Sequence, residues 1–176
     1  EVDKPAKRLV RKRWPGVLEW GSVTSITREI IEKIGDVYKH CTDAVFIGAG
    51  SPCQDLSSLN AHRTGLSGSK SRLFYQVPRI IALFRKVFGD KTYYFVENVF
   101  SMHKSQVLKF SEALRTKPYM IDGGDFTYCY RKRLYWCNWN ILPSDFVKVT
   151  DQGHFFHVEV TVEKPPASSW ISDNSI

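Results

Sequence analysis

Residues 46–57 read FIGAGSPCQDLS, an apolar run that passes into a glycine-rich turn carrying a thiol. The apolar run at residues 44–47 has the composition of a buried strand, and the two glycines and the proline after it indicate a sharp turn. Cys53 is therefore expected just past the carboxyl end of a strand, where open α/β sheets bind ligands and carry out chemistry. Taken alone, the residue has two interpretations, a nucleophile or an inert turn cysteine.

Segments of helical and strand-like pattern alternate on both sides of this turn. Apolar stripes predict helices over residues 25–34, 72–88 and 104–115, and β-forming runs predict strands over residues 17–20, 43–47, 92–96, 119–121 and 133–137. Pro78 implies a kink in the second helix, and alternating Val158, Val160 and Val162 predict a half-exposed strand near the end. The alternation predicts an α/β fold with a mostly parallel sheet and flanking helices.

Composition narrows the function classes before any motif is considered. The chain has 176 residues, 25 Lys and Arg against 18 Asp and Glu, and a net charge of +7. This balance favours an anionic partner, with nucleic acid the first candidate. The basic segment 1–16 is either a solvated lead-in or a contact to a DNA backbone. No apolar run is long enough for a membrane span, so no membrane association is expected.

The four cysteines form no CxxC pair, and their spacing fits neither a zinc finger nor a dense disulfide framework. We therefore expect no metal site and free thiols in a reducing compartment. The long loop at residues 48–71 is rich in glycine, serine and asparagine, and long loops in compact domains tend to be functional.

Two further polar motifs lie at the ends of predicted strands. Glu97 and Asn98 follow the strand at 92–96, and Arg131 and Arg133 lie at the entry to the strand at 133–137. Each motif also has a non-catalytic interpretation. Glu97 and Asn98 could be a helix cap or part of a solvated loop, and the two arginines could be a solvated basic edge. Because neighbouring parallel strands end at one edge of a sheet, Cys53 and Glu97 are expected to face one pocket.

A thiol, a carboxyl group and an arginine pair suit the activation of cytosine at carbon 5. Thiolate addition to carbon 6 breaks the aromaticity of the ring and makes carbon 5 enamine-like. A carboxyl group kept partly protonated by burial favours that addition at ring nitrogen 3, and an arginine on oxygen 2 holds the ring. Carbon 5 can then accept a methyl group from a sulfonium donor.

These motifs together resemble the DNA cytosine-5 methyltransferases, and most closely their eukaryotic de novo branch. SPC at 51–53 is similar to the catalytic Pro-Cys motif, FVENV at 95–99 to the Glu-Asn-Val motif, and YRKRLYW at 130–136 to the Arg-x-Arg motif. Residues 58–74 resemble the active-site loop of that branch, and residues 9–27 its approach to the third motif. The resemblance covers about residues 9–140 and keeps the family's motif order.

The resemblance implies a role for each matching residue. Cys53 would be the nucleophile, Glu97 the cytosine-binding acid, and Arg131 and Arg133 the groups that orient and polarise the base. Residues near the cofactor, S-adenosylmethionine, would be Ser22, Val23, Thr24, Ser51, Pro52 and Leu73. Residues that contact the base or DNA would be Gln54, Ser57, Asn60, Arg63, Lys70 and Asn98. The target cytosine must flip out of the duplex, because its carbons 5 and 6 cannot be reached in the stack.

Two departures from the family pattern bear on the cofactor and the loop. Ser22 stands where the third motif usually has aspartate, and Gln54 where the de novo branch commonly has asparagine. The first, second, ninth and tenth motifs are not seen, so the chain reads as a fragment or a degenerate member. We therefore expect a Rossmann-like S-adenosylmethionine-dependent core, truncated on its N-terminal cofactor side.

The resemblance also predicts the domain organisation and the cellular location, and it leaves alternative functions to consider. Residues 17–142 would be a partial catalytic domain, and residues 143–176 an extension with one strand and a frayed tail. It implies a nuclear protein in epigenetic regulation, with DNA as partner and possible assembly with another methyltransferase subunit. The alternative is a catalytically inactive regulatory subunit. A cysteine hydrolase using His62 or His103 fits less well, since neither histidine has an evident orienting carboxylate.

Overall fold

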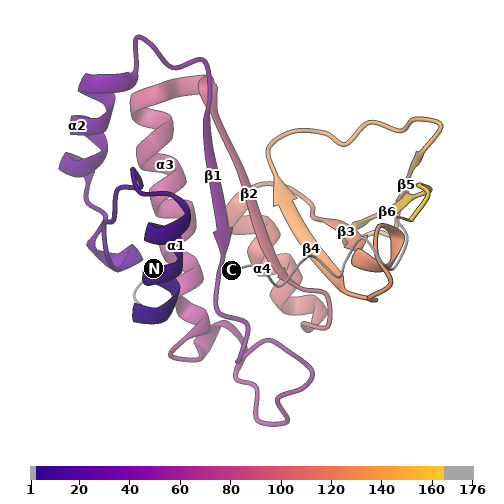
Figure 1. Ribbon diagram of the computed structural model, residues 1–176. Coiled ribbons are helices and arrows are strands. Elements are labelled where there is room, and N and C mark those ends of the chain that lie inside the picture. Colours follow the sequence, from indigo (N-terminus) through magenta and orange to yellow (C-terminus); the bar gives the residue numbers. More distant parts are fainter. Residues whose placement is uncertain (1–2, 165–176) are drawn as a thin grey trace. The chain divides into compact units, whose positions relative to one another are not determined.

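The computed structural model describes residues 3–164 (Figure 1). The chain divides into two compact units, one within residues 1–47 and 73–93, the other within residues 48–72 and 94–176. The helices are α1 (Lys4–Arg13), α2 (Arg28–Tyr38), α3 (Gln76–Phe88) and α4 (Lys104–Leu114). The strands are β1 (Val45–Gly50), β2 (Thr92–Val99), β3 (Tyr119–Asp122), β4 (Lys132–Cys137), β5 (Val147–Asp151) and β6 (Phe156–Val160).

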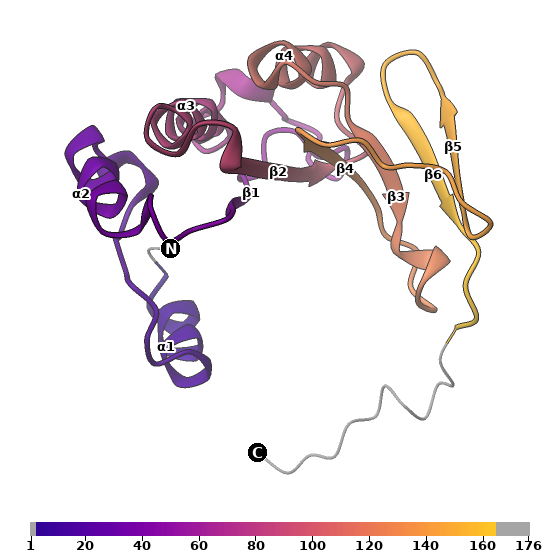
Figure 2. The ribbon, with the colours of Figure 1, turned by 90° about the horizontal axis from the view of Figure 1, so that it is seen from above.

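The strands form one sheet in the order β1-β2-β4-β3-β6-β5 (Figure 2). The predicted α/β class with a Rossmann-like sheet is confirmed. In the described registers β3 and β6 run parallel, whereas β2–β4, β3–β4 and β5–β6 run antiparallel. Pairing is therefore mixed and not mostly parallel, because β4 returns between β2 and β3 and β5 folds back on β6.

The core of the first unit lies between α2 and α3. Ile31 of α2 is fully buried and packs with apolar residues of α3, among them Ile80, Phe84 and Phe88. The guanidinium of Arg79 donates hydrogen bonds to the carbonyls of Val23 and Ile26, at 3.2 and 2.8 Å. The segment that precedes α2 is therefore fastened to α3 by polar as well as apolar contacts.

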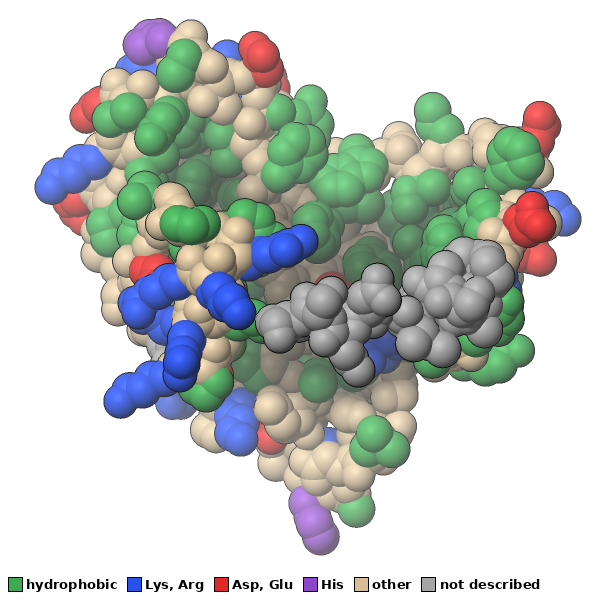
Figure 3. All heavy atoms as spheres, viewed as in Figure 1, with side chains coloured by type: hydrophobic (Ala, Val, Ile, Leu, Met, Phe, Trp, Pro, Cys, Tyr) green, Lys and Arg blue, Asp and Glu red, His purple; other side chains and the backbone are tan. Residues whose placement is uncertain are grey.

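The basic start of the chain is helical, and the strand predicted after it is absent. Asp3 caps α1, and Lys7 and Arg11 of this helix form ion pairs with Glu19, which lower the pKa of that carboxyl. Residues 17–20 are irregular, because Leu18 is 68% exposed and Glu19 faces the helix. Other Lys and Arg side chains of α1 gather on one surface (Figure 3).

In the second unit, α4 covers one face of the sheet. The rings of Phe110 on α4 and Trp136 on β4 lie 4.9 Å apart, and both side chains are fully buried. The indole Nε1 of Trp136 donates to Ser111 Oγ at 3.0 Å, so the largest core side chain also has its polar atom satisfied. The opposite face carries a second apolar cluster around Tyr119, Cys137 and Val158.

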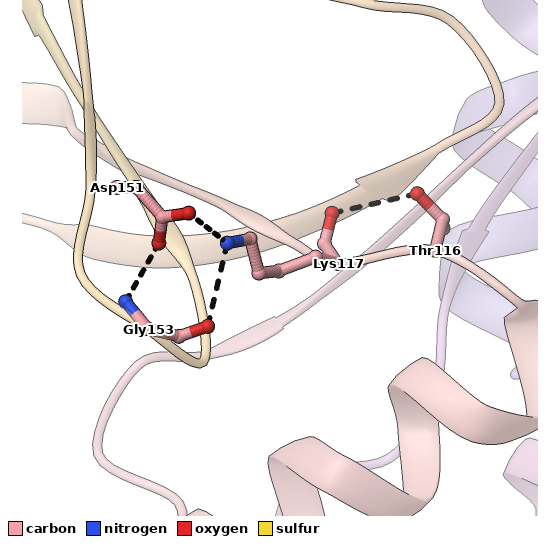
Figure 4. Close-up of polar contacts among 4 residues, drawn as sticks. All are labelled: Thr116, Lys117, Asp151 and Gly153. Atoms are coloured by element: carbon pink, nitrogen blue, oxygen red, sulfur yellow. Dashed lines mark hydrogen bonds and ion pairs between the residues drawn. The ribbon is translucent and has the colours of Figure 1, made fainter.

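The C-terminal part contains a hairpin where a single strand was predicted. Val158 and Val160 lie on β6, Val162 lies beyond it, and β5 pairs antiparallel with β6. Lys117 fastens the hairpin turn, with its Nζ 2.6 Å from Asp151 Oδ2 and 3.3 Å from the carbonyl of Gly153 (Figure 4). The predicted frayed tail, residues 165–176, lies outside the described residues.

Element boundaries differ from the predictions at two functionally relevant places. Pro78 lies in the first turn of α3, where a missing N–H costs nothing, so it causes no kink. Glu97 and Asn98 lie inside β2, which continues to Val99, and do not follow its end. Among the described residues, no helix is long and apolar enough to cross a membrane.

Candidate functional site

The turn after β1 brings the Cys53 segment alongside β2 within the second unit. A Cβ placed on Gly50 would lie 3.5 Å from Glu97 Oε2, so the end of β1 runs next to that carboxylate. The following residue, Ser51, is held by Asn98, whose Nδ2 donates to the Ser51 carbonyl at 3.1 Å and to its Oγ at 2.9 Å. Asn98 is 1% exposed, so these bonds are shielded from water.

Cys53 is a free, half-buried thiol whose backbone is fixed on both sides. Its carbonyl accepts hydrogen bonds from the N–H groups of Leu56 and Ser57, both at 2.9 Å. The carbonyl of Pro52 accepts a hydrogen bond from the buried Ser71 hydroxyl at 3.1 Å. The backbone makes these contacts, which leaves the thiol itself available for chemistry.

Asp55 organises the loop behind Cys53, a role that the sequence alone did not reveal. Its Oδ2 accepts from the Ser71 N–H at 3.1 Å, and its carbonyl accepts from the Gly65 N–H at 2.8 Å. A Cβ on Gly68 would lie 2.1 Å from the same carboxylate oxygen, so only glycine fits there. An acidic residue two positions after the cysteine, in a loop rich in N–H donors, is the signal that could have found it.

Glu97 and Arg133 form the charged centre of the site. Nε of Arg133 on β4 lies 2.8 Å from Oε1 of Glu97 on β2, with side-chain exposures of 20% and 32%. Arg133 Nε is buried without an aligned hydrogen bond, so charge attraction holds this contact. Burial was expected to act on Glu97; its side chain is half-buried and faces a cation.

Tyr135 lies beside this pair, and Arg131 makes its contact elsewhere. Tyr135 is opposite Glu97 in the β2–β4 register, and burial together with the Glu97 charge raises the pKa of its phenol. Arg131 is exposed, and its backbone N–H donates to Asp122 Oδ1 at 2.7 Å. The structure therefore brings Arg133 to Glu97, but it does not bring Arg131 there.

Of the residues expected to contact DNA, Asn98 is buried on β2, where its amide binds Ser51, and the others lie on a loop with its own hydrogen-bond network. Asn60 Nδ2 donates to the Gln54 carbonyl at 2.8 Å, and Arg63 Nη1 donates to the Ser101 carbonyl at 3.1 Å. Ser57 Oγ accepts from the Leu59 N–H at 3.3 Å. Gln54 and Lys70 are exposed side chains of the same loop. The loop is ordered enough to present a defined surface.

The residues expected near the cofactor fall into two groups. Ser22, Val23 and Thr24 lie in the first unit. Val23 lines a cavity of about 330 Å³ there, with apolar residues such as Val17, Trp20 and Ile26 and with the paired Lys7 and Glu19. Leu73 is half-buried in the same unit, and Ser51 and Pro52 lie in the second. The Ser22 hydroxyl already bonds to Thr24, at 2.8 Å from its Oγ1 and 3.3 Å from its N–H.

The cavity provides a test of the cofactor's fit. A flat apolar base such as adenine suits a cavity lined by Val17, Trp20 and Val23. Trp20 and Val17 were not predicted to line a cavity, because their apolar pattern was interpreted as a strand. The size and apolar part of this cavity suit the adenine end of the cofactor that the family resemblance implies.

Replacing Asn98 by alanine should destabilise the protein by about 1–3 kcal/mol, because the Ser51 carbonyl and hydroxyl would lose their buried donor. Denaturant unfolding measures this change directly. Asn60→Ala is the matched control, since its amide lies in the half-exposed loop. Equal stability of Asn98→Ala and the parent would show that the Asn98–Ser51 hydrogen bonds do not stabilise the fold.

Comparison with known families gives one finding. A family model described as C-5 cytosine-specific DNA methylase matches residues 1–119. The matched region contains the Cys53 turn and Glu97, while Arg131 and Arg133 lie beyond it.

Proposed function

Because the chain belongs to the C-5 cytosine-specific DNA methylase family, we propose that it methylates carbon 5 of a flipped-out cytosine in DNA through a covalent adduct at Cys53. Family membership supports DNA cytosine-5 methyltransferase activity in general. The observation that carries the finer proposal is the anchoring of the Cys53 turn beside the Glu97–Arg133 pair, through Gly50 and the Asn98–Ser51 bonds.

The proposed reaction begins with addition of the Cys53 thiolate to carbon 6. The sulfur–carbon bond forms, and the electron pair of the 5,6 double bond moves toward carbon 5 and the ring. Glu97 is proposed to share a proton with ring nitrogen 3 and to accept a hydrogen bond from the exocyclic amine, so charge that develops on this edge of the base is met by hydrogen bonds. Carbon 5 would take the methyl group of the sulfonium donor, whose sulfur would keep the bonding electron pair and leave as a neutral thioether. Loss of the carbon 5 proton to water then re-forms the 5,6 double bond and expels the Cys53 thiolate.

Arg133 supports this chemistry through Glu97. Its guanidinium fixes the carboxylate from one side at 2.8 Å, which restricts the rotamers available to Glu97 before the base arrives. The partly buried cation also offsets charge that collects on the base. Arg131, exposed directly before the same strand, is proposed to bind a phosphate or the outer edge of the base.

The methyl donor proposed is S-adenosylmethionine, which when bound supplies an electrophilic methyl group on sulfonium. Val23 and Trp20 would hold its adenine in the cavity of the first unit. The family resemblance also assigns Ser51, Pro52 and Leu73 to the cofactor. Ser22 offers a hydroxyl that is already shared with Thr24, so its hold on the cofactor would be weaker than that of the usual aspartate.

We also propose the narrower assignments that the sequence motifs suggest. The loop at residues 58–74 supports membership of the eukaryotic de novo branch. A nuclear location and a role in epigenetic regulation follow from that branch. Assembly with another methyltransferase subunit is proposed on the same ground.

Incubation of the chain with S-adenosylmethionine labelled in its methyl group and with cytosine-containing DNA tests the proposal. We expect label in the DNA at carbon 5 of cytosine. Calorimetric binding of S-adenosylmethionine is the companion measurement. A preparation that binds DNA but neither binds the donor nor transfers label would support the inactive regulatory subunit instead.

A further inference from the structure

Several hydrogen bonds fix the backbone of the turn that joins β3 to β4. Asp122, 7% exposed at the end of β3, accepts hydrogen bonds through Oδ1 from the N–H groups of Gly124 and Arg131, at 3.0 and 2.7 Å. Burial alone would raise the pKa of Asp122, but these donors with nearby Lys132 and His157 lower it. Gly123 N–H also donates to the Arg131 carbonyl at 3.2 Å, which closes the turn.

Bonds inside the turn hold its tip as well. The Thr127 N–H and hydroxyl both donate to the Gly123 carbonyl, at 2.9 Å each. The Cys129 N–H donates to the Thr127 hydroxyl at 3.1 Å. The carboxylate of Asp125 accepts from the Val160 N–H at 3.3 Å, so the acid of the turn is already engaged. Side chains on this turn are therefore presented from a defined backbone.

This fixed turn exposes aromatic rings. Tyr130 is 89% exposed, Tyr128 59% and Phe126 41%. A Cβ on Gly124 would lie 2.7 Å from Tyr130 Cδ1, so the tyrosine ring rests on a glycine that leaves room for it. One part of the ring is supported and the rest faces solvent, which is the geometry of a stacking platform.

Cations flank the aromatic rings on the same turn. Arg131 and Lys132 follow Tyr130 directly and are exposed. The ammonium of Lys164 lies 5.8 Å from the centre of the Tyr128 ring. An aliphatic protein partner would not need such charges, whereas a nucleic acid strand offers bases to the rings and phosphates to the cations.

We propose that Tyr130, supported by Gly124 and flanked by Arg131 and Lys132, stacks on a nucleotide base next to the methylated cytosine. Tyr128 extends the same platform. Arg133, three residues after Tyr130, contacts Glu97, so the turn leads directly into the candidate site. The inference rests on the proposed function, since that function places DNA at this site.

The test measures binding of fluorescently labelled DNA by anisotropy, with a duplex that carries one mismatched cytosine. Tyr130→Ala should weaken binding by about fivefold to about a hundredfold, the range for loss of one base–aromatic stack. Tyr130→Phe should retain binding, because the ring is kept. Lys132→Ala should lower the salt dependence by about one phosphate contact. Tyr38→Ala, a 47% exposed tyrosine on α2, is the control and should bind as the parent does.

The outcomes separate this inference from the proposed function. If Tyr130→Ala binds DNA as tightly as the parent, the proposed stacking of Tyr130 on a base is wrong, even if the parent methylates DNA. The same result is expected if the turn binds a protein partner instead. Loss of affinity in Tyr130→Ala but not in Tyr130→Phe supports the platform even if the parent transfers no methyl group. Equal losses in Tyr130→Ala and Tyr38→Ala would overturn it, since the effect would not be local.

Discussion

Cys53→Ala is expected to reduce methyl transfer to DNA by about 10⁴-fold or more, because no other group in the proposed reaction can form the bond to carbon 6. The folded state should be retained. Hydrogen bonds at this position are made by the Cys53 carbonyl, which the substitution leaves in place, and the side chain is only half-buried. Initial rates with labelled S-adenosylmethionine measure the loss.

Two controls make the Cys53 result specific. Cys41→Ala removes an exposed thiol in the first unit and should leave the rate unchanged. DNA affinity of Cys53→Ala should stay within a few times that of the parent, since the thiol acts after the base is bound. A Cys53→Ala protein with more than a tenth of the parent rate would contradict nucleophilic catalysis at this position.

Glu97→Gln should lower the rate by about 10²- to 10⁴-fold, the contribution expected of a general acid–base group. The amide keeps the shape of the side chain but loses the charge that faces Arg133 at 2.8 Å. Arg133→Ala should lower the rate by a similar factor, because Glu97 would lose the cation that fixes its position. Arg131→Ala, on an exposed arginine that does not contact Glu97, should cost less.

The double variant Glu97→Gln/Arg133→Ala tests whether the two residues act as a unit. Groups in direct contact give combined losses smaller than the product of the single losses. Rates of the parent, the two single variants and the double variant complete the cycle. A double loss equal to that product would show that the ion pair has no role in positioning Glu97.

The motifs proposed to form the site could be recognised in the sequence because they are local. Cys53, Glu97 and Arg133 each lie within a short segment whose strand pattern and chemistry can be recognised without tertiary information. The helices α2, α3 and α4 were found for the same reason, since their apolar stripes repeat along the sequence. The glycines and the proline around Cys53 likewise predict a turn from the local sequence.

The missed features depend on partners distant in sequence. Residues 17–20 have an apolar pattern that suits a strand, but Leu18 is exposed and Glu19 pairs with α1. Strand β5 forms by pairing with β6, and the sequence of residues 147–151 alone shows only a weak strand pattern. The role of Asp55 depends on Ser71, sixteen residues later. Such pairings are set by tertiary contacts that override local preference.

Pairing direction was the main error in the predicted sheet. Alternation of helix and strand suggested a mostly parallel sheet, yet β4 enters antiparallel between β2 and β3. That reversal has a functional consequence, because it places Arg133 next to Glu97 on the adjacent strand. The antiparallel strand is therefore part of how the fold assembles its charged centre.

Trapping with DNA that contains 5-fluorocytosine tests the central claim most directly. After methylation, fluorine on carbon 5 cannot leave as a proton does, so elimination is blocked and the enzyme stays bonded to carbon 6. With S-adenosylmethionine present, the account predicts a denaturation-resistant adduct whose crosslink maps by mass spectrometry to Cys53 and which Cys53→Ala abolishes. An adduct that survives this substitution, or that maps to another residue, would contradict it.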